Sequence, residues 1–115
     1  MAEEVRGIKR LYWVAQGKAE EASLLLAAGR DSAARTVAAN GLATIQGLPQ
    51  RGFARDAEAR MTGVRGGALW RKGRAAEALP VLRKSLALHL AQYDPVHSPA
   101  VANARRALAE ALRAR

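Results

Sequence analysis

Residues 59–90 read ARMTGVRGGALWRKGRAAEALPVLRKSLALHL, and the expected architecture follows from them. In two segments of this stretch the apolar residues recur at the spacing of an α-helix, and a turn at Gly73 separates these segments. Small residues at Gly66, Ala78 and Ser85 let two helix backbones approach closely, while leucines beside them fill the space around the contact. These residues therefore predict a helical hairpin.

The same pattern occurs 44 residues earlier in the chain. This shift aligns turn, small and apolar residues: Ala22 with Gly66, Leu25 with Leu69, Gly29 with Gly73, Arg30 with Arg74, Ala34 with Ala78, Val37 with Val81, Gly41 with Ser85 and Leu42-Ala43 with Leu86-Ala87. A period in this range is typical of stacked helical pairs. The sequence therefore predicts two units, approximately residues 3–47 and 52–93, followed by a capping helix at 99–114.

The first unit is expected to contain one long and one shorter helix. Residues 3–28 keep a single apolar face through Gly17, so one unbroken helix is favoured and a break at that glycine is the alternative. Asp31 or Ser32 is expected to cap the second helix, and the run Gly47-Leu48-Pro49 ends it.

The second unit is expected to contain helices at about 52–72 and 75–92, with Pro80 just past the first turn of the latter. The predicted inner stripe of the first of these helices is Ala54, Ala57, Met61, Val64 and Ala68. Three glycines within the same helix weaken it by propensity, so tertiary packing has to hold it together. Ser98-Pro99 marks the start of the last helix, whose predicted inner face is Val101, Ala104, Leu108 and Leu112.

The residues from 59 to 90 resemble the tetratricopeptide repeat in their small and large helix positions, their Gly-Arg turn and the E-A-L run that follows. The run from Tyr93 to Ala102 is similar to the link of the longer, kinesin-light-chain-like repeats. The resemblance implies an all-α fold, a right-handed α-solenoid of antiparallel helical hairpins spanning 1–115 as one domain. Two units and a cap are fewer than the three or more repeats that a stable solenoid usually has. Either the chain is therefore a fragment of a longer solenoid or self-association covers its ends.

Composition agrees with a small helical domain. The chain has 115 residues, its apolar content comes largely from alanine, and cysteine is absent, which removes disulfides and thiolate metal sites. The longest apolar runs are far too short to cross a bilayer, and the first residues lack the apolar core of a signal peptide. We expect a cytoplasmic protein without a membrane partner.

The net charge of +9 is the strongest compositional deviation. It attracts acidic protein surfaces, nucleic acids and anionic membranes alike, and a solvated arginine-rich surface is the alternative that involves no partner.

Catalysis has no candidate centre in the sequence, so we expect no enzyme activity, no cofactor and no metal. His89 aligns with Ile45 and is therefore expected at the edge of a packing face, while His97 belongs to the link between units. The carboxylates are expected on polar helix faces, and no glycine-rich stretch follows a strand as a phosphate-binding loop would.

In the resembled family the first helix of each unit lines a concave groove. The resemblance therefore implies a basic partner-binding surface whose residues are Arg60, Trp70, Arg71, Asn103, Arg106 and Arg113, with Gly63 and Gly67 beside them. Arginine binds carboxylates in a bidentate manner, and Trp70 could anchor an apolar side chain or could instead pack beside the next helix. The Lys and Asn pattern that binds chaperone tails is not reproduced.

The sequence thus favours a non-catalytic interaction scaffold that binds a peptide, a protein helix or another copy of itself, with an acidic partner suited to the charge. The alternative is nucleic-acid binding. A faint helix-turn-helix spacing at Ala59, Gly63 and Leu69 is attributed to coincidence, because it lies inside the internal repeat. Few aromatic residues are present for stacking on bases.

Overall fold

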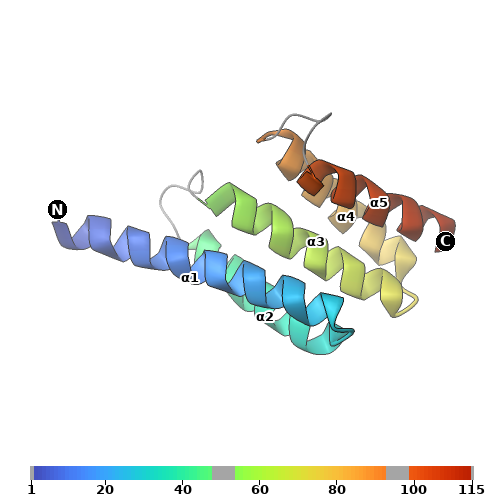
Figure 1. Cartoon of the computed structure of the whole chain (residues 1–115), viewed down its shortest axis with the longest axis horizontal. Coiled ribbons are helices and arrows are strands. Elements are labelled where there is room, and N and C mark those ends of the chain that lie inside the picture. Colours follow the sequence, from blue (N-terminus) through green and yellow to red (C-terminus); the bar gives the residue numbers. More distant parts are fainter. Residues whose placement is uncertain (1, 48–53, 93–98, 115) are drawn as a thin grey trace.

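The computed structural model describes residues 2–47, 54–92 and 99–114, and within these ranges the chain forms α-helices and no strands (Figure 1). The five helices are α1 (Ala2–Ala27), α2 (Asp31–Gln46), α3 (Arg55–Arg71), α4 (Ala75–Leu90) and α5 (Pro99–Ala114). The prediction of an all-α chain is confirmed for these residues. So is the unbroken passage of α1 through Gly17.

The helices pack in a regular order. Each helix packs against the next one along the chain, and α3 also lies against both α1 and α5. The three odd-numbered helices therefore lie next to one another in one layer, and α2 and α4 form a second layer behind them. Figure 1 shows α3 in the middle, with α1 and α2 on one side and α4 and α5 on the other.

The turns of the two helix pairs have the same geometry. Gly29 and Gly73 both have φ of +79°, the left-handed conformation that a glycine adopts without strain. In the first turn the N–H of Arg30 donates to the carbonyl of Leu25, and in the second the N–H of Arg74 donates to the carbonyl of Leu69. Leu25 and Leu69, which the 44-residue shift aligns, thus have the same role.

The second helices of the two pairs also correspond. Both α2 and α4 have 16 residues and begin and end 44 positions apart. The buried residues Ala34, Ala38, Gly41 and Ile45 of α2 align with the buried residues Ala78, Leu82, Ser85 and His89 of α4. Positions that the internal repeat aligns are therefore buried in both helices.

The core consists largely of alanine. Ala15, Ala19 and Ala22 of α1 are fully buried, as are Ala34 and Ala38 of α2. The predicted inner stripe of α3 is buried too, with exposed fractions of 0 to 4% from Ala54 to Ala68. Side chains this small bury little area each, so the core depends on the close approach of the helix backbones.

Glycines in α3 allow that approach. A methyl group on Gly66 would lie 2.6 Å from Cγ and Cδ2 of Leu82, and one on Gly63 would lie 2.9 Å from Oγ of Ser85. The Ser85 hydroxyl is buried and donates to the carbonyl of Ala59 over 2.8 Å. Tertiary packing thus compensates for the poor helix propensity of this segment, as the sequence predicted.

Two local predictions were wrong. Neither Asp31 nor Ser32 caps α2, because the turn at Gly29 starts the helix early and makes Arg30 the N-cap, without a side-chain hydrogen bond. Asp31 lies in the first turn, where a carboxylate favours the positive end of the helix dipole. In α5 Val101 is buried as predicted, but near the end of the helix Ala111 is buried in place of Leu112, which is 41% exposed because it lies about 100° further around the helix.

Ser98 and His97 fall outside the described residues, and so does the link that joins α4 to α5. Within the described part of the chain, no helix combines the length and the apolar character that crossing a membrane requires.

Candidate functional site

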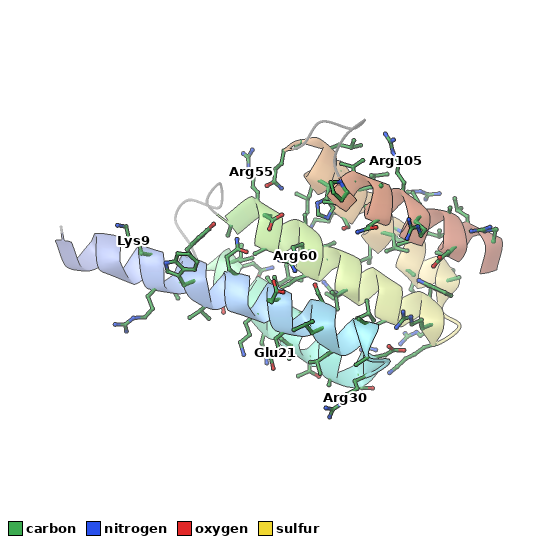
Figure 2. All side chains as sticks on the ribbon, in the orientation of Figure 1. Lys9, Glu21, Arg30, Arg55, Arg60 and Arg105 are labelled. Atoms are coloured by element: carbon green, nitrogen blue, oxygen red, sulfur yellow. The ribbon has the colours of Figure 1, made fainter. Side chains whose placement is uncertain are left out.

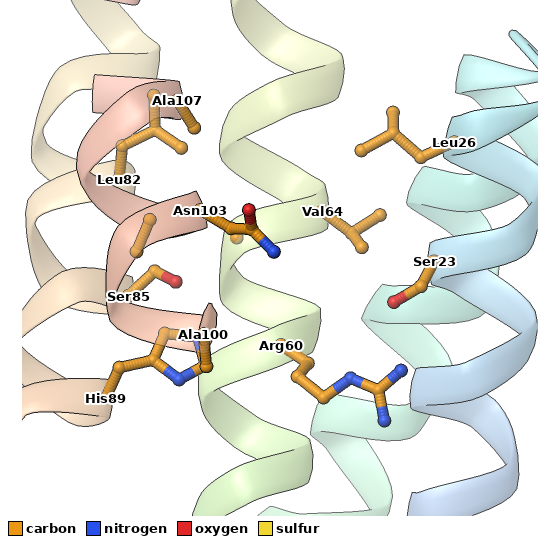
Figure 3. Close-up of a pocket in the computed structure, with 12 residues that line it drawn as sticks. Ser23, Leu26, Arg60, Val64, Leu82, Ser85, His89, Ala100, Asn103 and Ala107 are labelled. Carbon is orange, nitrogen blue, oxygen red and sulfur yellow. The ribbon is translucent and has the colours of Figure 1, made fainter. Parts of the chain in front are cut away.

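A cavity of about 420 Å³ opens between α1 and α5, above the middle of α3 (Figure 3). Ser23 and Leu26 of α1 form one wall, and α3 provides the floor. The remaining lining residues come from α3, α4 and α5: Arg60, Gly63, Val64, Leu82, Ser85, His89, Ala100, Asn103, Ala104 and Ala107. Four of the five helices therefore contribute to one site.

Small residues create this space. Gly63 leaves the surface of α3 without a side chain, and three alanines of α5 line the opposite wall: Ala100, Ala104 and Ala107. The two walls have no helix-to-helix contact with each other, since α1 and α5 each pack on α3 instead. The result is a groove along α3 with an apolar base.

Arg60 provides the positive charge of the groove. Its Nη2 donates to Oε2 of Glu20 over 3.2 Å, which links α3 to α1 across the opening. Figure 2 shows Arg60 on the side of α3 that is turned towards α1. The Glu20 side chain is 63% exposed, so this ion pair contributes at most about 1 kcal/mol to stability. A carboxylate of a bound segment could replace Glu20 at little cost.

His89 forms part of the wall near Arg60. The residue is 5% exposed, and burial lowers its pKa below the ordinary value of 6.5, opposed by the charge of Asp56 and assisted by that of Arg60. The imidazole is therefore neutral at neutral pH and offers a polar group without adding charge. The sequence placed His89 on a packing face, and its burial confirms that prediction.

The structure brings together two of the six residues expected in the groove. Arg60 and Asn103 both line the cavity, from α3 and α5 (Figure 3). Arg106 and Arg113 are exposed on α5 and do not line it. Gly67 is buried, with a side chain of α1 only 3.2 Å from where its Cβ would lie.

Trp70 and Arg71 make structural contacts. Trp70 is partly buried against the apolar cluster formed by Ala78, Leu79, Leu82 and Ala111, which corresponds to the packing alternative. Nη1 of Arg71 donates to the carbonyl of Leu26 over 2.8 Å and to Oδ1 of Asp31 over 3.1 Å. Arg71 thereby ties the end of α3 to the turn of the first helix pair.

Sequence reasoning expected Gly63 in the groove, and this residue lines the cavity, but it missed the alanines of α5 that shape the opposite wall. The signal was present as a three- and four-residue spacing of alanine in α5, at Ala100, Ala104 and Ala107. This spacing fits a packed helix face equally well. Only the separation of α1 from α5 shows that part of this face lines open space.

A second recess, of about 180 Å³, lies among α2, α3 and α4. Three arginines reach it, Arg35 of α2, Arg65 of α3 and Arg74 at the N-cap of α4, together with Leu69 and Glu77. Arg74 forms a bidentate pair with Glu77, in which its Nε and Nη2 donate over 3.0 and 2.8 Å. The recess thus contains one carboxylate and three guanidinium groups, so it carries excess positive charge.

No family model, curated protein or solved structure matches this chain. In the ranges 2–47, 54–92 and 99–114, no group of three or more His, Cys, Asp or Glu residues is placed to hold a metal ion. A proposal for the function therefore depends on the geometry of the groove and the recess.

Proposed function

We propose that this protein is a non-catalytic interaction module that binds a peptide or a protein helix in the groove between α1 and α5. The observation that carries the proposal is the cavity itself. It has an apolar base, one arginine at its opening and an amide at its rim, Asn103. At about 420 Å³ it lies within the range of roughly 300–1,000 Å³ that ligand pockets occupy.

We assign the fold to the tetratricopeptide-like α-solenoids, with two helix pairs and a capping helix. Two features support this assignment. The turns and buried positions of the two pairs agree at a shift of 44 residues. The odd-numbered helices adjoin one another in a single layer, as the first helices of stacked units do.

The proposed mode of binding places an extended or helical segment along α3. One of its apolar side chains enters the cavity against Leu26, Val64 and Leu82, and an acidic residue displaces Glu20 from Arg60. Because the walls are helices that are already packed, little ordering cost arises in the protein upon binding. The net charge of +9 favours encounter with an acidic partner.

A selection from a display library of random peptides tests the proposal. Enriched peptides are expected to carry an acidic residue near a large apolar one, and titration calorimetry then gives their affinities. R60Q is expected to weaken binding about tenfold, in line with about 1.5 kcal/mol for a hydrogen bond to a charged group. R83Q is the matched control, because Arg83 is exposed on α4 and lines neither the cavity nor the recess. Equal losses in both variants would refute the assignment of the groove.

The second candidate function is nucleic-acid binding, and the arginine recess among α2, α3 and α4 favours it. Three guanidinium groups, from α2, α3 and the N-cap of α4, line this recess, and arginine is a common hydrogen-bond donor to phosphate oxygens. Binding of random duplex and single-stranded oligonucleotides across a salt series distinguishes the two functions. Tight binding that falls steeply with salt, and that R35Q and R65Q weaken while R60Q does not, would favour nucleic acid.

A further inference from the structure

One face of α1 is exposed although it carries a large aromatic residue. Arg10, Trp13, Gly17 and Glu20 follow one another at steps of three, four and three, which places them on a single helical stripe. All four are exposed, and Trp13 retains 70% of its surface in contact with solvent. Figure 1 shows the N-terminal part of α1 extending past the other helices.

The internal repeat shows what such a stripe does elsewhere in the same chain. The equivalent positions, 44 residues later, are Ala54, Ala57, Met61 and Val64, and these are 0 to 4% exposed. They belong to the core cluster that α3 forms with α1 and α2. The stripe of α1 thus occupies the position at which α3 receives a neighbouring helix pair, but no helix of the described residues covers it.

The sequence of the stripe is complementary to itself. When two copies of α1 lie antiparallel about a two-fold axis level with Ala15, Arg10 of each copy lies level with Glu20 of the other. In the same arrangement Trp13 of each copy lies level with Gly17 of the other. A cation thus faces an anion twice, and an indole faces a glycine twice, as an isologous contact requires.

We propose that two copies of this chain associate through this stripe, with the two α1 helices antiparallel. Gly17 has no atom within 4 Å of the position that a Cβ would occupy, so the indole of a second copy can lie directly on the helix backbone. Tryptophan is one of the residue types enriched among the residues that dominate binding at the centres of protein interfaces. Glu20 accepts from Arg60 through Oε2, and its 63% exposed side chain stays accessible to the arginine of the second copy.

Charge complementarity is the reason for choosing a second copy as the occupant. A partner with an unrelated apolar face would cover Trp13 but would bring no opposite charge to Arg10 or Glu20. Lys9 and Glu21, the sequence neighbours of Arg10 and Glu20, have the same charges as these two residues (Figure 2). In the antiparallel arrangement Lys9 of each copy lies level with Glu21 of the other, which adds to the attraction between the two helices.

Sedimentation equilibrium of the full chain and its charge variants tests the proposal. The unaltered protein is expected to approach twice its mass of 12.3 kDa as its concentration rises. R10E and E20K are each expected to weaken association at least about tenfold, because each places like charges opposite one another. An equimolar mixture of the two variants is expected to form a heterodimer, since the introduced acid of one then faces the introduced lysine of the other, and the unaltered Glu20 faces the unaltered Arg10. The double variant R10E/E20K is expected to associate with itself again.

L112A is the matched control, because Leu112 is an exposed leucine on α5 and lies outside the stripe. It should leave association unchanged, while W13A should abolish it. Far-UV circular dichroism of each variant verifies that these exposed substitutions preserve the fold. A protein that stays monomeric up to about 1 mM would overturn the proposal. A dimer that survives R10E and E20K, or a mixture that remains monomeric, would overturn it equally.

Discussion

Replacing Gly66 by alanine is expected to destabilise the protein even though alanine is the better helix former. The added methyl group would lie 2.6 Å from two side-chain carbons of Leu82 and 3.3 Å from its backbone nitrogen. Leu82 is 1% exposed and belongs to the apolar cluster that also contains Ala78 and Ala111, so it has little room to move. Overpacking of this kind costs about 2–3 kcal/mol, and the gain in helix propensity returns about 1 kcal/mol. The expected net loss is therefore about 1–2 kcal/mol.

Gly17 provides the matched control, since it also lies inside a helix. No atom stands within 4 Å of its Cβ position, so G17A keeps the propensity gain without the clash and should stabilise the protein by about 1 kcal/mol. Urea denaturation followed by circular dichroism, at low micromolar protein concentration where the monomer dominates, measures both variants. A G66A protein as stable as the parent, or shifts of the same sign in both variants, would refute the packing argument for α3 and α4.

Three further substitutions probe individual contacts. S85A removes the buried hydrogen bond to the carbonyl of Ala59 and is expected to cost about 1 kcal/mol in the same denaturation assay; an unchanged midpoint would show that the bond contributes nothing. Because burial lowers the pKa of His89, the unfolded chain binds the proton more readily, so stability should fall as the pH drops below 6.5 towards the lowered value. H89I should lose that part of the pH dependence, and an identical pH profile in the variant would contradict the assignment. R71A removes the donor to Asp31 and to the turn of the first helix pair, and a double-mutant cycle with D31A should give a coupling of about 0.5 kcal/mol; zero coupling would mean that water replaces the ion pair.

The repeat and its turns could be predicted because they depend on local chemistry. A left-handed turn needs glycine, so Gly29 and Gly73 marked both turns, and the 44-residue shift then aligned the buried positions of α2 and α4. The alignment even placed His89 correctly, because it occupies the position of Ile45. Periodicity likewise identified the buried stripe of α3.

The groove could be predicted only in part, because its composition depends on which surfaces remain uncovered. Arg60 and Asn103 were expected there and line the cavity, whereas Arg71 reaches back to the first helix pair through a contact between distant residues. Trp70 could have faced the groove or the core, and the sequence left both open. The exposure of Trp13 could not be predicted either. The 44-residue shift aligns its stripe with the buried face of α3, although the two differ in residue type.

Mapping a selected peptide on the isotope-labelled protein by NMR tests the proposed function most directly. We expect the amide shifts to change at Ser23, Gly63 and Asn103, which lie on three of the four helices that line the cavity. Changes confined to Arg35, Arg65 and Arg74, on the other recess, would contradict binding in the groove between α1 and α5.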